Sequence, residues 1–227
     1  MSRKVAFTMM ALFLGLVTAP LVAQDEEQTS RAEHLELVDK NRRTEIYADP
    51  DVDWSVYTQI RLDPATVAFR KNWQRDQNRS QPFRIKTEDI ERIKSELSEM
   101  FDEVFSEELT TNGGYVMATE NGDDVLRIAP QIVDLDVYAP DTRNTPGTTR
   151  SYAESSGRMT LKLDMYDSVT GDLIATASDR QEAPRRGYMQ WTTSVTNRAD
   201  AQRMLQRWAV DLREGLDNAR KGQPISE

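Results

Sequence analysis

The chain has 227 residues, of which 38% are apolar, and this length and composition can bury the core of one large domain or two small ones. The 38 acidic and 29 basic residues give a formal net charge of -9, which opposes binding to nucleic acids and anionic lipids because both require clustered Lys and Arg. With no Cys and one His, disulfides, thiolate chemistry and multi-histidine metal sites are excluded.

The first 23 residues have the pattern of a secretory signal. Arg3 and Lys4 precede an apolar run over residues 5–22, and the small residue Ala23 follows it. We predict that residues 1–23 are a cleaved signal peptide and that the protein is periplasmic. The alternative is an uncleaved N-terminal helix that tethers the protein to the membrane.

The tetrad at this cleavage point, Leu21-Val22-Ala23-Gln24, is similar to a bacterial lipobox. In a lipobox the fourth residue is the Cys that carries the lipid. Since Gln24 has no thiol, we expect no stable lipid anchor.

The rest of the chain divides into a leader, one folded body and a tail. Residues 24–44 are mostly charged or amide-bearing and predict a flexible polar leader, because they offer little apolar surface to offset the entropy of ordering. His34 lies in this leader without a second metal ligand nearby, and we interpret it as a surface side chain. Residues 45–221 are expected to form a single α+β domain, and residues 222–227 a disordered tail.

The body begins with strand-like segments and a loop. Residues 57–62 and 66–69 are rich in β-branched and aromatic side chains, and they predict two strands on either side of Asp63-Pro64. Residues 71–86 are polar and predict a long loop with Trp73 as an anchor.

An amphipathic helix is predicted from residue 87 onward. Thr87 is the expected cap, and Asn112-Gly113-Gly114 ends the helix, because glycine readily adopts the left-handed conformation found there. The apolar residues recur every three to four positions, as one buried helix face requires: Ile90, Ile93, Leu97, Met100, Phe101, Val104 and Leu109.

Residues 115–118 and 125–138 predict a hairpin, since Asn121-Gly122 between them favours a tight turn. The alternation of the second strand changes phase near Pro130, which predicts a bulge or an edge position there.

The C-terminal half repeats the pattern of strands followed by a helix. Residues 159–167 alternate strictly between apolar and polar, and residues 173–177 are expected to return as the paired strand. A polar loop over residues 179–193 precedes a last helix over residues 198–219, with Asn197 as its cap. This order predicts an α+β fold in which a mainly antiparallel sheet is packed by two long amphipathic helices.

No constellation of residues predicts an enzyme, a metal site or a cofactor. Asp49, Asp51 and Asp53 alternate as at the start of a calcium loop, but the sixth place lacks glycine and Ile60 occupies the place of the bidentate glutamate. The only histidine lies in the leader, so a Ser-His pair is not expected. Three other carboxylates are expected on the solvated face of the sheet: Asp134, Asp136 and Asp164.

Several of these features, in order, resemble one known family. They include the long helix that ends in glycine and a set of aromatic and turn residues: Tyr47, Pro50, Val52-Asp53-Trp54-Ser55, Tyr57, Leu62-Asp63-Pro64, Asp167-Ser168 and Thr170-Gly171. The chain is similar over about Glu45 to Arg220 to the domain of unknown function 3313, found in bacterial envelope proteins, many of them lipoproteins. The resemblance implies an envelope location and assigns no activity. Gln24 departs from the lipidated relatives, which have Cys there.

We favour a non-enzymatic periplasmic or outer-membrane-associated module that binds another envelope protein. The expected contact is the loop with Arg185, Arg186, Tyr188 and Trp191, because such residues often anchor interfaces. A basic loop without a partner and a core position for Trp191 are the alternatives at these residues. The sequence does not fix the oligomeric state.

The alternative function is binding of a small ligand or a glycan. In that case Trp73, Tyr152, Tyr188 or Trp191 would stack on the ligand. A concave aromatic pocket would favour this alternative, whereas a flat exposed patch would favour a protein partner.

Overall fold

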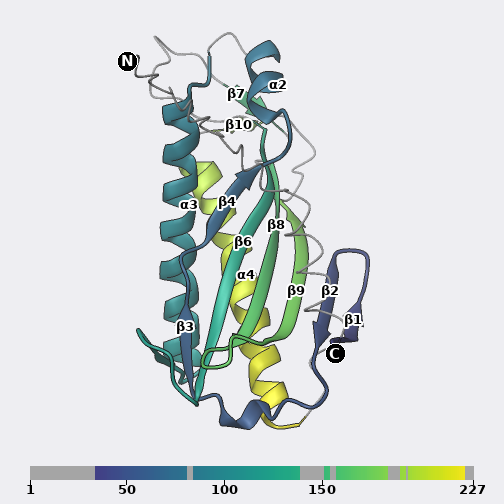
Figure 1. Cartoon of the computed structure of the whole chain (residues 1–227). Helices are drawn as coiled ribbons and strands as arrows, with labels where there is room; N and C mark the ends of the chain where they lie inside the picture. The colour runs from purple at the N-terminus through teal and green to yellow at the C-terminus, as the bar shows by residue number, and fades with distance from the viewer. Residues whose placement is uncertain are drawn as a thin grey trace, which may run out of the picture. The chain divides into compact units, whose positions relative to one another are not determined.

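Two long antiparallel strands, β6 (Val125–Val137) and β8 (Gly157–Asp167), run through the middle of the sheet (Figure 1). The computed structural model describes residues 34–80, 84–138, 151–153, 157–183, 190–192 and 194–222. Because strand side chains point alternately to the two faces, one face of each strand is apolar and buried. The buried residues on this face include Leu126, Ile128 and Ile132 of β6 and Met159, Leu161, Leu163 and Met165 of β8.

The main sheet has eight strands in the order β1-β2-β9-β8-β6-β3-β5, and β4 also pairs with β6. The other strands are β1 (Glu36–Lys40), β2 (Thr44–Ala48), β3 (Gln59–Leu62), β4 (Thr66–Phe69), β5 (Val116–Met117) and β9 (Leu173–Glu182). Pairing is antiparallel from β1 to β6, whereas β3 and β4 run parallel to β6 and β5 runs parallel to β3. The fold is therefore α+β as predicted, but its sheet is mixed.

A short antiparallel pair, β7 (Ser151–Ala153) and β10 (Gln190–Thr192), forms a second sheet. The polar loop predicted over residues 179–193 is wrong at both ends. Residues 179–182 extend β9, where Asp179 pairs with Leu161, and residues 190–192 form β10. The sequence could not reveal this extension because residues 179–182 are all polar and show no apolar alternation.

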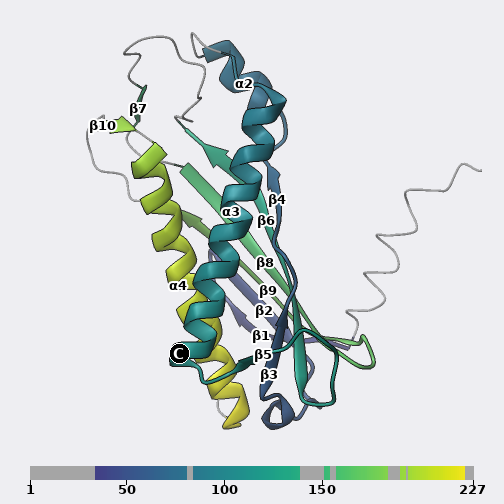
Figure 2. The ribbon, with the colours of Figure 1, turned by 90° about the vertical axis from the view of Figure 1, so that its left-hand side faces the viewer.

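Two long helices lie side by side on one face of the sheet, as Figure 2 shows. They are α3 (Thr87–Glu107), which continues into the π-helical turn η2 (Glu108–Asn112), and α4 (Ser194–Arg220). The predicted apolar stripes face the sheet and the neighbouring helix, and their buried residues include Leu97, Phe101, Val104, Leu205, Trp208 and Leu216. Phe105 is also buried but was not part of the predicted stripe. Thr87, the suggested cap, is instead the first residue of α3, and Lys86 caps that helix. α4 begins at Ser194, three residues before its suggested cap Asn197.

The predicted loop over residues 71–86 contains a third helix, α2 (Trp73–Ser80). Trp73 is only 1% exposed; its ring stacks on Phe69 at 4.1 Å between centroids and its Nε1 donates to the carbonyl of Val137. Asn78 donates to the carbonyl of Ile85 and accepts from its N–H. One buried aromatic and these backbone contacts hold a helix whose other residues are polar, so no apolar period signalled it.

The predicted flexible leader overlaps the first hairpin. Residues 36–40 form β1, which pairs with β2, and β2 pairs in turn with β9. Leu37 is 52% exposed, so β1 is held by backbone pairing at the edge of the sheet more than by burial. His34 lies on the surface as predicted, and its Nε2 is 2.7 Å from the carbonyl oxygen of Leu173.

The predicted hairpin of residues 115–118 with residues 125–138 is wrong. β5 and the start of β6 do not pair with each other, because β3 lies between them and is parallel to both. The Asn121-Gly122 turn is held instead by Ser168, whose Oγ donates to the carbonyl of Gly122 and accepts from its N–H. Local turn chemistry was present, but a strand from another part of the chain took the pairing positions.

The phase change in β6 occurs, but it does not fall at Pro130. Pro130 pairs with Leu163 in regular register, and the register shifts between Val133 and Asp136. Asp134 has a φ of 52° in this bulge. Pro130 is tolerated because β3 ends at Leu62 and β4 starts at Thr66, so the missing N–H lies beside a gap in the ladder.

Candidate functional site

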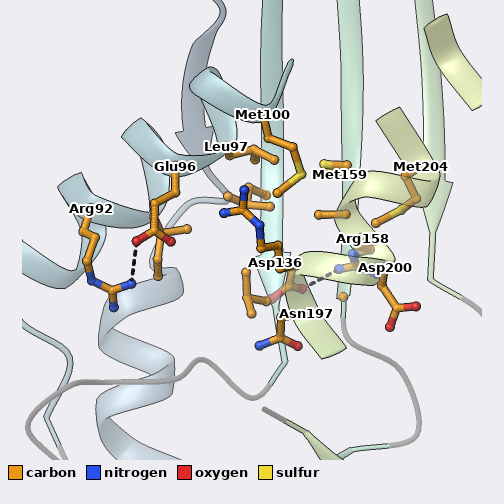
Figure 3. A pocket seen from close by; sticks show the side chains of 16 residues that line it. Arg92, Glu96, Leu97, Met100, Asp136, Arg158, Met159, Asn197, Asp200 and Met204 are labelled. Carbon is orange, nitrogen blue, oxygen red and sulfur yellow. Dashed lines mark hydrogen bonds and ion pairs between the residues drawn. The ribbon is translucent and has the colours of Figure 1, made fainter. Parts of the chain in front are cut away.

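A cavity of about 120 Å³ lies between α3, α4 and the paired ends of β6 and β8 (Figure 3). We call it the α3–α4 cleft. Buried apolar side chains from all four elements line it: Leu97, Met100, Leu135, Met159 and Met204. Polar and charged side chains also line it: Arg92, Glu96, Asp136, Arg158, Asn197, Arg198 and Asp200.

Local structure explains why these apolar residues meet. Leu97 and Met100 are three positions apart, which places them on one side of α3. Met159 belongs to the buried, alternating set of β8. The bulge at Asp134 changes the phase of β6 and thereby brings Leu135 into the core cluster. The cleft therefore depends on the bulge as well as on the helices.

Asp136 is the most deeply buried carboxylate of the β6–β8 pair, with 4% of its surface exposed. Its Oδ2 accepts from Arg70 Nε at 2.9 Å and is 3.2 Å from Arg158 Nη2. Hydrogen bonds to Asp76 and to Asp136 raise the pKa of Arg70. The expectation that Asp136 lies on a solvated face is wrong, because arginines from two other segments supply the counter-charge that permits burial.

The other two carboxylates of that expectation differ from Asp136. Asp134 is exposed, in line with the prediction. Asp164 is half-buried, accepts from Thr176 Oγ1 at 3.1 Å and is 3.4 Å from Gln131 Nε2. The three carboxylates therefore do not form a catalytic pair, since each has its own surroundings.

The charges around the cleft are balanced. The lining holds three arginines and three carboxylates: Arg92, Arg158 and Arg198, and Glu96, Asp136 and Asp200. Arg92 Nη1 is 3.3 Å from Glu96 Oε1, and Arg203 pairs with the buried Asp200. Such a rim repels neither sign of charge, so the apolar floor sets the preference for an occupant.

The volume limits what the cleft can hold. Sites for small-molecule ligands commonly enclose about 300–1,000 Å³, whereas an apolar cavity of about 150 Å³ holds one benzene ring. At about 120 Å³, the cleft accommodates one group the size of a large apolar side chain. Its three methionines adapt readily to the shape of such a group, because their side chains are unbranched and polarisable.

The sequence missed this cleft. Met100, Met159 and Met204 each read as ordinary core residues of separate segments. Only the packing of α3 against α4 leaves space above them, and no local pattern encodes that space. The methionines were the one compositional signal, but their spacing in the chain does not predict that they meet.

The predicted partner-binding residues are not brought to this cleft by any described contact. Arg185, Arg186 and Tyr188 lie outside the described residues, as does the predicted signal over residues 1–23. Trp191 belongs to β10, where its backbone pairs with that of Tyr152. Trp73, a predicted stacking residue, is the first residue of α2. Its side chain is buried and is not available to a ligand.

The residues weighed as calcium ligands have roles in turns. Asp49 accepts from the N–H of Asp51, and Asp53 accepts from the N–H and Oγ of Ser55. Within the ranges that the structure describes, no three His, Cys, Asp or Glu residues gather with the geometry of a metal site. No helix among those same ranges is long and apolar enough to cross a membrane.

The comparisons with known proteins give one family and several distant structures. The family described as "Protein of unknown function (DUF3313)" matches residues 29–212. No curated protein matches the chain.

The solved structures are only weakly similar. The PelC dodecamer from Paraburkholderia phytofirmans is 10% identical, with 72% of this chain and 91% of that chain covered and a TM-score of 0.34. A PDZ domain protein from Parabacteroides distasonis is 10% identical, with 83% and 40% covered and a TM-score of 0.39. A minor lipoprotein from Acinetobacter baumannii is 12% identical, with 74% and 98% covered and a TM-score of 0.34. Scores this low carry no argument about function or assembly.

Proposed function

The chain belongs to the DUF3313 family of proteins of unknown function, and from this premise we propose that it is a non-enzymatic binding module of the bacterial envelope. In this proposal the α3–α4 cleft holds one apolar anchor residue of a protein partner. The observation that carries the proposal is a cleft the size of one side chain, with a methionine-rich floor and a charge-balanced rim.

Anchor residues of protein interfaces commonly fill such pockets. A few large side chains supply most of the binding energy, and they insert into desolvated pockets surrounded by polar contacts. Arg92 and Arg158 at the rim can donate hydrogen bonds to the partner backbone around the anchor. Small ligands and glycans remain the alternative, supported by the concave shape but opposed by the small volume.

The residues at the cleft support binding rather than catalysis. Asp136 and Glu96 each lie within ion-pair distance of an arginine, so their charges hold the rim in place. The single histidine, His34, is on the surface beside Leu173, which is not among the lining residues. A proton-transfer role would need a group free to accept and release a proton next to the bound group.

Photo-crosslinking tests the proposed cleft. Benzoylphenylalanine placed at Ile93, a partly buried lining residue, is expected to capture a discrete envelope protein in intact cells. The same amino acid at Lys162, exposed on β8, provides the control. We expect Ala201→Phe to fill the cleft and abolish capture, whereas Gln202→Phe, at the neighbouring exposed position of α4, should preserve it.

Two outcomes would contradict the proposal. Capture that persists in a folded Ala201→Phe protein would show that the cleft does not hold the partner. Equal loss in Ala201→Phe and Gln202→Phe would show a disturbance of α4 rather than a blocked cleft. Unfolding midpoints measured for both variants separate this second case from loss of folding.

The envelope location needs its own test. The proposal expects the mature protein to start at Gln24 and to fractionate with soluble periplasmic proteins. Intact mass decides this, because a retained segment of residues 1–23 and an added acyl chain each change the mass by a defined amount. Either change would overturn the expectation of a soluble exported protein.

The predicted loop is proposed as a second contact. Arg185, Arg186, Tyr188 and Trp191 combine the residue types that anchor interfaces. Trp191→Ala should weaken capture of the partner by about 1–3 kcal/mol without lowering the unfolding midpoint. A lowered midpoint would instead assign Trp191 to the core, and unchanged capture with unchanged stability would exclude both roles.

A further inference from the structure

A second cavity lies against the C-terminal half of α4, whereas the α3–α4 cleft lies against its N-terminal half. It encloses about 120 Å³ between α4, β8, β9 and β2, and we call it the β2–α4 groove. Its walls are apolar residues such as Ile46, Leu163 and Leu216, together with Trp54, which belongs to the short 3-10 helix η1 (Trp54–Val56). The groove shares α4 with the α3–α4 cleft, but no lining residue is common to both.

The charged residues that line this groove are both acidic. They are Asp179 of β9 and Asp211 of α4, and no Lys or Arg is among the lining residues. Asp179 accepts hydrogen bonds from two neutral donors, Thr44 Oγ1 at 2.7 Å and Trp208 Nε1 at 2.6 Å. These bonds fix the position of Asp179 without neutralising its charge.

Asp211 adds a second negative charge at the same groove. Within the described part of the chain, the carboxylate of Asp211 makes no hydrogen bond and no ion pair. The nearby guanidinium of Arg207 donates instead to Gln181 Oε1. Asp211 is exposed at the edge of the groove. Desolvation of its carboxyl, followed by the charges of Asp179 and Glu214, raises the pKa of Asp211, and Arg207 opposes this in part. The lining therefore carries two acidic groups and no basic one, which favours a cation over an anion.

Trp54 supplies the other feature of a site for organic cations. It is partly buried, lines the groove and packs edge-to-face against Tyr57, with centroids 6.2 Å apart. The negative face of an indole ring attracts ammonium groups, and it does so more strongly where water is displaced. The apolar walls favour a cation with methyl or alkyl groups over a hydrated metal ion, which would lose its water shell without replacement ligands.

We propose that the β2–α4 groove binds a small organic ammonium ion, with its alkyl groups against the apolar walls and its charge beside Asp179, Asp211 and Trp54. The volume matches a single head group of this kind. The proposal is independent of the partner proposed for the α3–α4 cleft, since the two cavities lie along different halves of α4 and share no lining residue.

Choline and its uncharged isostere dimethylbutanol test the proposal on the full chain. Both have the same branched end, but only choline is charged. We expect saturable choline binding, followed by tryptophan fluorescence and confirmed by calorimetry, and no saturable binding of dimethylbutanol. Asp211→Asn and Trp54→Leu should each weaken choline binding about fivefold to tenfold, as expected for a partly desolvated cation.

The matched control is Asp164→Asn, because Asp164 belongs to β8 but does not line the groove. It should bind choline like the unchanged protein. Equal binding of choline and dimethylbutanol, no saturable binding of choline, or equal weakening in Asp164→Asn would overturn the proposal. The unfolding midpoint of each variant must match that of the unchanged protein, so that a loss of choline binding is not a loss of folding. Crosslinking from Ile93 with choline present reports separately on partner capture at the α3–α4 cleft.

Discussion

Leu97 and Glu99 lie two positions apart on α3 and face different surroundings. Leu97 is buried against the sheet and α4, whereas Glu99 is exposed and accepts a hydrogen bond from Ser95. Leu97→Ala should therefore lower the free energy of unfolding by about 2–5 kcal/mol, and Glu99→Ala by less than about 0.5 kcal/mol. Denaturant midpoints measure both changes. Equal losses of stability in the two variants would mean that Leu97 does not lie on the buried side of α3.

Single residues were predictable from sequence where burial alone decides their position. The alternation of β8 correctly separated Met159, Leu161 and Leu163 from the polar residues between them. Asp136 failed this reasoning because its burial depends on Arg70 and Arg158, and neither lies near it in the chain. The sequence around a carboxylate does not show which arginine will lie beside it in the folded protein.

At the scale of elements, a half-buried ion pair joins η2, which continues α3, to α4. Arg213 Nε donates to Glu108 Oε1 at 2.7 Å, and the same guanidinium also reaches Asp217. Burial alone would raise the pKa of Glu108, but the hydrogen bonds from Arg213 and Asn112 outweigh it, so the pKa is lowered. This pair thus favours the folded state when Glu108 is ionised.

Glu108→Gln should lower the free energy of unfolding near neutral pH by about 1–2 kcal/mol, as expected for a charged hydrogen bond. Because the pKa of Glu108 is lower in the folded state, its contribution is complete above its ordinary value of 4.5 and is lost as pH falls through the lowered value. Unfolding measured at neutral and acidic pH should therefore show the variant and the unchanged protein converging in acid. Glu107→Gln, at the adjacent exposed position, is the control.

Elements with an apolar period were predictable, and those held by a few specific contacts were not. The stripes of α3 and α4 identified both helices to within a few residues. α2 lacked such a stripe, since Trp73 is its one buried apolar residue and its amides bind backbone groups. The α3–α4 cleft could not be predicted from an apolar period, because it arises from how two correctly predicted helices pack together.

At the scale of the whole molecule, the order of strands in the sheet was beyond local patterns. The β5–β6 hairpin was a reasonable prediction from Asn121-Gly122, but β3 returns from an earlier part of the chain to lie between the two strands. β2 likewise joins β9 through residues such as Ile46 and Ala177. The α+β class could be read from the sequence, whereas the parallel half of the sheet required knowledge of these distant partners.

Ile46→Pro tests the importance of that junction. Ile46 pairs with Asp39 on one side and Ala177 on the other, so proline there removes a donor from the interior of the ladder. We expect a loss of stability of about 3 kcal/mol or more and increased light scattering, because β9 becomes an unprotected edge. Val38→Pro, in the irregular part of edge strand β1, should have a much smaller effect. A similar loss of stability in Ile46→Pro and Val38→Pro would contradict the pairing of β2 with β9.

The pairing of β2 with β9 joins two strands that are synthesised at different times. Thr44 and Asp179, which share a hydrogen bond across this junction, are 135 residues apart in the chain. At about 5–20 residues per second, the ribosome delivers the second of them on the order of ten seconds after the first. Throughout that interval the N-terminal hairpin has no strand to join. The first strands of the sheet to be synthesised therefore precede by many seconds the strand with which β2 pairs.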